Sequence, residues 1–326
     1  MDCGGALRHL QSIFGIFFLI LLVSCQPSPP TVTLALLGDL MLGRGVQPAK
    51  DSFAYLAPEL QTADLAIANL ESPLTYHPPS AGPSSGYNLC AQASSAKWLP
   101  VWGLDLLTLA NNHRYDCGPE GSVETARLLS NLGLGAIGPG PEPLIRQVNG
   151  LKLAFFSFDD VLSPLDGAAA ASLIHSARAE GALVIVSVHW GLEYQGGASE
   201  RQKSLAQQFA QAGAALVIGT HPHVLQPAEW LNPSVGNGSG TPDRVASPDG
   251  DTGSRDTFVL YSLGNALFDQ PGLPDTRQSA LVLVKLDTGG VSSARAVSFI
   301  IDVPHSRVVA PNVQTAQQIL TRLHLP

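Results

Sequence analysis

The feature that most constrains the fold is a repeated pattern in which a short apolar strand ends at a small group of polar residues. The clearest case lies around residue 217, where Val217 and Ile218 follow a polar helical segment and lead into Gly219. Apolar, β-branched runs that end at a glycine predict buried strands. Further strands of this kind are expected at 31–37, 65–68, 104–110, 151–158, 183–188 and 258–262.

Helical and loop segments alternate with these strands. We expect helices at 52–61, 96–102, 119–132, in the alanine-rich run ending at 180, at 200–211 and at 314–323. The runs 280–286 and 294–301 predict an antiparallel hairpin, 76–86 predicts a loop, and 232–256 predicts a mobile surface insertion. Because the chain has no internal repeat and no interdomain linker, we predict one α/β domain over about 31–305, with a C-terminal helix and tail at 306–326.

Charge and length exclude some classes of partner. The chain has 326 residues, a formal net charge of −8 and only 13% charged residues, and it contains no basic run. Binding to the nucleic-acid backbone needs clustered lysine and arginine. We therefore expect no nucleic-acid partner.

The N-terminus predicts export. Arg8 and His9 precede an apolar run at 13–23, which is too short for a stable transmembrane helix but suits the core of a signal peptide. The run ends in Leu22-Val23-Ser24-Cys25, which resembles the bacterial lipobox, and a Pro/Ser-rich tether follows at 26–30. This pattern predicts a lipoprotein signal peptide over 1–25 and lipidation of Cys25. An ordinary secretory signal, or a short buried helix with an incidental cysteine, is the alternative.

Two further cysteines, Cys90 and Cys117, would remain in the mature protein. A disulfide between them is permitted in an oxidising compartment. Two cysteines in a chain of this length form no framework, so the sequence leaves the pairing open.

Polar residues that suit a metal site follow strand after strand. In open α/β sheets, ligands gather at the carboxyl ends of the strands. Carboxylate, amide and imidazole groups together suit Mn, Fe or Zn better than Mg or Ca. The alternative is a hydrogen-bonded polar rim around a pocket without metal. The residues concerned are Asp39, Glu71, Asn112, His113, His189, His221, His223 and Asn265.

The order of these motifs resembles the calcineurin-like metallophosphoesterases, and more closely the CapA family of poly-γ-glutamate capsule synthesis proteins. The resemblance covers roughly residues 31–303. It rests on six blocks in fixed order: Gly38-Asp39 with Arg44, Asn69-Leu70-Glu71, Asn111-Asn112-His113 with Asp116 and Gly118, His189-Trp190-Gly191 with Glu193-Tyr194, His221-Pro222-His223-Val224 with Gln226, and Tyr261-Ser262-Leu263-Gly264-Asn265 with Asp269.

This resemblance implies a four-layer αββα sandwich with a two-metal site. Glu71 would be the bridging carboxylate. Asn112, His189 and His221 would complete one metal site, and Asp39 with His223 the other. His113 would act as the general acid on the leaving group, Asp116 would fix the loop that carries His113, and Arg44 would hold an anionic group of the substrate.

Four more residues are candidates for substrate binding: Asn69, Trp190, Glu193 and Asn265. Trp190 would either stack on a substrate or pack in the core. Glu193 would either orient the ring of His189 or cap a turn. Asn265 would either contact the substrate or form a turn.

Two positions depart from the phosphoesterase pattern. Those enzymes carry a histidine two residues after the first aspartate, where this chain has Met41, and an aspartate as the bridging ligand, where it has Glu71. Both departures resemble CapA proteins, and the first leaves the Asp39 side of the site with one ligand fewer. One or two divalent ions are therefore expected.

The function that follows from the resemblance is that of a membrane-anchored, extracytoplasmic protein of capsule polymer synthesis. It would act on poly-γ-glutamate or a similar anionic envelope polymer by metal-dependent hydrolysis or transfer, with membrane-bound synthase subunits as further partners. The first alternative is a non-catalytic component that binds or anchors the polymer. A weaker alternative is a metal-dependent phosphoesterase.

Overall fold

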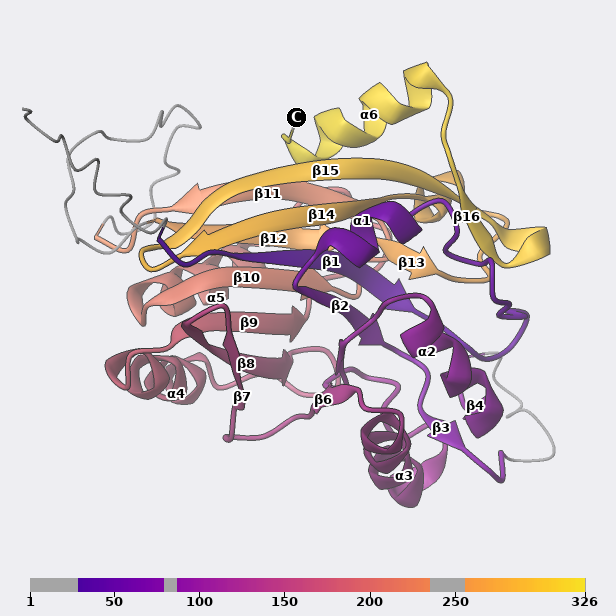
Figure 1. The fold of residues 1–326 in the computed structure, drawn as a ribbon, viewed down its shortest axis with the longest axis horizontal. Helices are drawn as coiled ribbons and strands as arrows, with labels where there is room; N and C mark the ends of the chain where they lie inside the picture. The colour runs from indigo at the N-terminus through magenta and orange to yellow at the C-terminus, as the bar shows by residue number, and fades with distance from the viewer. Residues whose placement is uncertain (1–28, 79–86, 235–255, 326) are drawn as a thin grey trace, which may run out of the picture.

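The computed structural model describes residues 29–78, 87–234 and 256–325, and its main body consists of two β-sheets that face each other (Figure 1). The predicted signal peptide, its Cys25, most of the tether and most of the 76–86 loop and of the 232–256 insertion lie outside these residues. Among the described residues, no helix is long and apolar enough to cross a membrane.

The first sheet has eight strands, and its centre is parallel. Strand β1 pairs with β2, and β2 with β5, in parallel register, while β14 and β15 form the antiparallel hairpin expected near the C-terminus. Strand β13 pairs with β1 beside this path. In order across the sheet the strands are β16 (Arg307–Val309), β15 (Gly290–Asp302), β14 (Gln278–Asp287), β1 (Val32–Leu40), β2 (Leu65–Leu70), β5 (Leu106–Thr108) and β6 (Gly135–Ile137), with β13 at Asn265–Leu267.

The second sheet has six strands, four of them parallel. Strands β8, β9, β10 and β12 run in the same direction, and antiparallel strands lie at both edges. The order is β11 (Leu225–Leu231), β12 (Thr257–Leu263), β10 (Ala214–Thr220), β9 (Leu183–His189), β8 (Leu151–Asp159) and β7 (Leu144–Val148). A separate pair, β3 (Leu74–Thr75) and β4 (Ala91–Gln92), lies outside both sheets.

Helices cover the outer faces of the two sheets. Side chains of α1 (Ala57–Thr62), α2 (Trp98–Val101) and α3 (Gly118–Asn131) pack against the first sheet, and those of α4 (Gly167–Ala179) and α5 (Glu200–Gln211) against the second. Short 3₁₀ turns complete the described elements at Ala93–Lys97, Pro274–Arg277 and Val303–His305. The α/β class predicted from the sequence is confirmed.

The alternation of side chains along β1 explains how one strand serves two cores. Leu34 and Leu36 point into the layer between the sheets, whereas Ala35 and Leu37 pack toward the helices, as the two-residue period of a strand requires. Helix α6 (Val313–Leu323) buries Ile319 and Leu323 in the layer between the sheets, above β15 and β11 in Figure 1. It closes one open side of that layer.

Some elements differ from the sequence prediction. The 52–61 helix is confirmed only as α1, because residues 51–56 form turns and the helix begins at Ala57, with Pro58 in its first turn. Seven strands were not predicted: β3, β4, β6, β7, β11, β13 and β16. Of these, β7 and β11 are edge strands whose side chains are mostly half-buried, so neither shows the apolar run that marked the central strands.

The two sheets meet at one point of close backbone contact. The chain leaves β12 of the second sheet and enters β13 of the first at Gly264, which has φ = +64°. There the backbone N–H of Asp39 donates to the carbonyl of Gly264 over 2.9 Å. This crossing brings the carboxyl ends of the central strands of both sheets together.

Candidate metal centre

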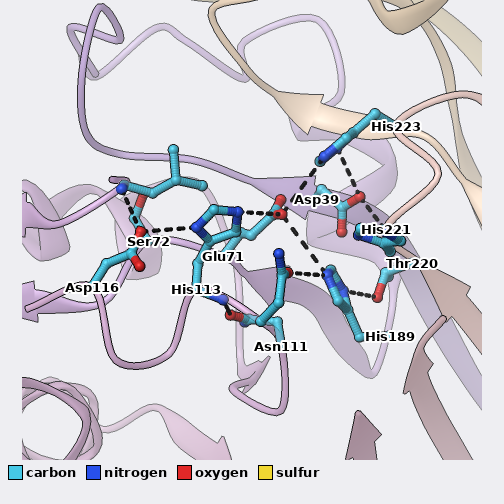
Figure 2. A network of polar contacts seen from close by, with 12 residues as sticks. Asp39, Glu71, Ser72, Asn111, His113, Asp116, His189, Thr220, His221 and His223 are labelled. Atoms are coloured by element: carbon cyan, nitrogen blue, oxygen red, sulfur yellow. Dashed lines mark hydrogen bonds and ion pairs between the residues drawn. The ribbon is translucent and has the colours of Figure 1, made fainter. Parts of the chain in front are cut away.

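The polar residues predicted from the strand ends converge on one buried site (Figure 2). Asp39 lies near the end of β1, Glu71 follows β2, His189 ends β9, and His221 and His223 follow β10. Each of these five residues is at most 5% exposed. The convergence follows from the parallel strands, because the carboxyl ends of neighbouring parallel strands lie at the same edge of a sheet.

Glu71 lies at the centre of the site and lacks a hydrogen-bond donor. Its Oε1 is 3.9 Å from Nε2 of His113, 3.9 Å from Nε2 of His189 and 3.8 Å from Nε2 of His223. These distances exceed hydrogen-bonding range, and neither Glu71 oxygen has a partner among the described residues. Burial and the nearby charge of Asp39 raise the pKa of Glu71 well above its usual value. Ionisation of a carboxyl in this setting is costly unless a cation lies beside it.

Asp39 differs from Glu71 because its oxygens accept hydrogen bonds. Oδ1 accepts from Nδ2 of Asn69 over 2.8 Å, and Oδ2 accepts from the backbone N–H of His221 over 3.0 Å. Burial by itself would raise the pKa of Asp39, but its hydrogen bond to His223 and the charge of that ring lower it. Asp39 is therefore held as a carboxylate.

Asn69 is buried, and its side chain bonds to other protein groups instead of facing solvent. It is 2% exposed, and its Oδ1 accepts from Thr108 Oγ1 and Asn111 Nδ2, each over 3.2 Å. All of these contacts place it behind Asp39. We therefore reassign it from substrate binding to the positioning of Asp39.

His189 is fixed at both ring nitrogens. Nδ1 lies 2.9 Å from Thr220 Oγ1, and Nε2 lies 2.8 Å from Asn112 Oδ1. Burial lowers the pKa of His189 well below its usual value, which keeps the ring neutral. Thr220 was not among the site residues predicted from the sequence. Its position at the end of β10, opposite His189 in the β9–β10 register, is the signal that would have found it.

His221 and His223 occupy backbone conformations that are unusual for side-chain-bearing residues. Their φ angles are +97° and +58°, and both rings point into the site. Nδ1 of His223 lies 2.9 Å from Asn265 Oδ1, which leaves Nε2 facing Glu71. The position of Asn265, fully buried behind His223, corrects its predicted contact with the substrate.

The two rings differ in protonation. Burial lowers the pKa of His221 to about 4, and the positive charge of His223 contributes in the same direction. Burial would also lower the pKa of His223, but the charges of Glu71 and Asp39 and its hydrogen bond to Asp39 raise it to about 9. In the metal-free protein, His223 therefore balances part of the negative charge of the two carboxylates.

His113 lies at the more open side of the site. Its Nδ1 is 2.8 Å from Asp116 Oδ2, and its side chain is 16% exposed. Asp116 also accepts from the backbone N–H of Leu89 over 2.6 Å, next to a disulfide between Cys90 and Cys117. Such a cross-link stabilises a fold by about 3 kcal/mol. The bond that the sequence left open thus fixes the loop carrying His113 and Asp116.

The remaining candidates lie around this core. Arg44 forms an ion pair with Asp269, and its guanidinium lies 5.5 Å from the centre of the Phe268 ring. Trp190 is fully buried under the second sheet's helices, where its Nε1 donates to the carbonyl of Tyr261 over 2.9 Å. Its surroundings fit the packing role, and we drop substrate stacking.

Two groups of residues could hold a metal ion. One consists of Asp39, Glu71 and His223, and the other of Glu193, His221 and His223; within each group the ligand atoms lie within 4.8 Å of one another. Glu193 therefore lies beside His221 and His223. The ring of His189, which Glu193 was predicted to orient, is instead contacted at its two nitrogens by Thr220 and Asn112. The residues present fit a divalent-metal centre, and the orphaned carboxylate of Glu71 is the strongest sign of it.

Comparison with known proteins gives concordant matches. A model of the family described as "Bacterial capsule synthesis protein PGA_cap" matches residues 33–270. The PGA biosynthesis protein CapA of Bacillus subtilis (strain 168) is 31% identical over 289 residues, which cover 81% of this chain and 70% of that protein. The capsule biosynthesis protein CapA of Bacillus anthracis is 28% identical over 294 residues, covering 80% of this chain and 65% of that protein.

Among solved structures, that of a hypothetical protein from Thermus thermophilus is similar with a TM-score of 0.51. It covers 82% of this chain and 99% of its own, at 17% sequence identity. At that identity the likeness extends to the fold alone.

Proposed function

This chain belongs to the PGA_cap family of bacterial capsule synthesis proteins, and from that membership we propose that it acts outside the cytoplasm, through a divalent-metal site, on poly-γ-glutamate or a similar anionic polymer. Family membership supports a role in capsule polymer synthesis. The chemistry we propose is hydrolysis or transfer at an amide or phosphoester bond of that polymer.

The observation that carries the metal proposal is the Glu71 carboxylate, which is buried without a hydrogen-bond donor among three imidazole nitrogens. We assign Glu71 as the ligand shared between two ions, with Asn112, His189 and His221 on one side and Asp39 and His223 on the other. When bound, divalent ions would supply Lewis-acid stabilisation of a developing oxyanion and a hydroxide at neutral pH. Mn, Fe or Zn suit this mixed set of ligands.

The protein's own residues would do the remaining work. His113 presents Nε2 toward Glu71, while Asp116 holds Nδ1, so this ring is oriented to hold a proton for a leaving group. Arg44, held by Asp269, would bind an anionic group of the polymer. A groove of about 580 Å³ is lined by Tyr194 and Val224, the sequence neighbours of Glu193 and His223, and we propose it as the path of the polymer chain.

The order of layers supports a finer description of the fold. Helices, first sheet, second sheet and helices follow one another through three apolar clusters. We propose that this is the four-layer αββα sandwich of the metallophosphoesterase type, formed as a single domain by residues 31–305.

One observation favours a non-catalytic, polymer-binding role as the second candidate. Met41, where phosphoesterases carry a histidine, is fully buried in the cluster between the first sheet and its helices. A site with one ligand fewer would tolerate loss of the metal more easily. Retention of the oriented His113–Asp116 pair favours catalysis.

Metal content tests the proposed function. We expect about two divalent ions per purified chain after incubation with Mn²⁺ or Zn²⁺ and removal of the excess, with roughly one lost in His189→Ala and one in His223→Ala. Measurement is by elemental analysis of the gel-filtered protein. One ion, lost only in His189→Ala, would require a single-metal mechanism. If no ion binds, the non-catalytic role becomes the leading proposal.

Anchoring at the membrane is a separate proposal that rests on the lipobox-like sequence before Cys25. We expect Cys25→Ala to move the protein from the membrane fraction to the soluble fraction, because acyl chains on this cysteine would supply the hydrophobic attachment. Fractionation of expressing cells followed by immunoblotting measures this. Unchanged retention in the membrane fraction would refute lipidation at Cys25.

A further inference from the structure

The Asp39 side of the site is short of a ligand for a structural reason. Met41, two residues after Asp39, is fully buried in the apolar cluster that packs against the helices of the first sheet. As a thioether in an apolar cluster, Met41 supplies no imidazole or carboxylate to the site. A replacement ligand must therefore come from another element.

The loop after β9 brings a carboxylate to this position. The backbone N–H of Tyr194 donates to the carbonyl of Pro222 over 2.8 Å, which ties this loop to the turn that carries His221 and His223. The fully buried side chain of Gln226 donates to the carbonyls of Gln195 and Gly197 over 2.8 and 3.0 Å. These contacts hold Glu193 beside the two histidines, with ligand atoms within 4.8 Å of one another.

A second observation comes from His221 itself. Its ring is 5% exposed, and its Nδ1 is buried with no hydrogen-bond partner among the described residues. Buried ring nitrogens are normally paired, and each nitrogen of a metal-bound histidine contacts either the metal or a hydrogen-bond partner. The unpaired ring therefore points to a ligand in the group formed by Glu193, His221 and His223.

We propose that Glu193 is a metal ligand that compensates for the histidine missing at Met41, rather than a substrate-binding residue. The proposal rests on the metal site of the proposed function, adds Glu193 to the ion of Asp39 and His223, and places His221 beside that ion instead of the one held by Asn112 and His189. Glu193 is exposed, whereas Asp39 and Glu71 are fully buried. The ion held by Glu193 is accordingly the one that faces solvent and exchanges more readily.

The test compares metal affinity in full-length Glu193→Gln and wild-type protein. Titration with Mn²⁺, followed by calorimetry and by elemental analysis, should show one site weakened at least about 10-fold in Glu193→Gln. Glu193→Asp, which keeps the carboxylate, should recover part of that affinity. Glu142→Gln, at an exposed glutamate in the loop before β7, should bind as the wild type does.

The outcomes distinguish the ligand role of Glu193 from the metal site of the proposed function. If Glu193→Gln binds Mn²⁺ with wild-type affinity while His189→Ala loses an ion, Glu193 is not a ligand and the proposed metal site stands. If the wild-type protein binds no ion, both fail. Thermal unfolding in EDTA should be the same for Glu193→Gln and the wild type, because an exposed side chain contributes little to the metal-free fold. A lower melting temperature of Glu193→Gln in EDTA would attribute its loss of metal affinity to misfolding and would overturn the assignment of Glu193 as a ligand.

Discussion

Replacement of Glu71 by glutamine is expected to abolish metal binding while leaving the metal-free protein no less stable than the wild type. The amide has the shape of the carboxylate but carries no charge to attract a cation. Because Glu71 is shared by both proposed ions, its loss should affect both, in contrast to the single-ion losses expected for His189→Ala and His223→Ala. The expected metal content of Glu71→Gln is close to zero.

The expected stability of metal-free Glu71→Gln follows from the raised pKa of Glu71. A carboxyl whose pKa is higher in the folded than in the unfolded state binds its proton more tightly when folded. Its contribution to stability is therefore fully present below the unfolded pKa and is lost as pH rises from there through the folded pKa. At neutral pH the buried, unpaired carboxylate costs stability, and a neutral side chain removes that cost. In the wild type, metal binding removes this loss of stability because the ion balances the charge of the Glu71 carboxylate.

Thermal unfolding measures both effects. At a metal concentration 100 times the dissociation constant, binding stabilises the fold by about 2.7 kcal/mol, which raises the melting temperature by roughly 5 °C for a domain of this size. Wild-type protein should show this rise when metal replaces EDTA, and Glu71→Gln should not. Glu229→Gln, at a half-buried carboxylate of β11 that accepts from the hydroxyl of Tyr261, should respond as the wild type does. Wild-type metal content in Glu71→Gln would contradict the central position assigned to this residue.

Gly38→Ala is expected to cause a large loss of stability. A Cβ at position 38 would lie 1.9 Å from the carbonyl oxygen of Gly264 and 2.9 Å from its carbonyl carbon. Both are backbone atoms at the crossing between the sheets, so relief requires moving β1 away from β13. We expect a loss of about 3 kcal/mol in the free energy of unfolding, at the upper end for overpacking.

Urea unfolding followed by circular dichroism measures this loss. Metal content should fall as well, because displacement of β1 moves Asp39, the next residue, away from His221 and His223. Gly138→Ala is the matched control: no described atom lies within 4 Å of the Cβ position there, and the expected change is within about 0.5 kcal/mol. Wild-type stability of Gly38→Ala would show that the two strands do not approach each other as described.

The residues that converge at the site were predictable because their signal is local. A run of apolar residues marks where a strand lies, and the polar residue after it marks the edge of the sheet, as at His189 after β9 and Glu71 after β2. The edge strands gave no such signal. In β11, Pro227 and Glu229 lie among residues that are only half-buried, and pairing with β12 is what makes the segment a strand.

The roles of the surrounding residues were decided by contacts between distant parts of the chain. Asn265, considered a substrate contact or a turn former, orients His223 across 42 residues, and Thr220 orients His189 across 31. Trp190 follows His189 directly, yet it faces the helices because adjacent residues of an extended chain point to opposite sides.

The sequence by itself determined the α/β class, the family and the set of residues that meet at the site. Only the tertiary structure decided which nitrogen of each ring faces Glu71, that the two oxygens of Glu71 lack a donor, and that Glu193 lies beside His221 and His223. The physical reason is the range of the interactions. Hydrophobic periodicity acts between residues a few positions apart, whereas the hydrogen bond from His221 to Asp39 joins residues 182 positions apart and forms only when both sheets have assembled.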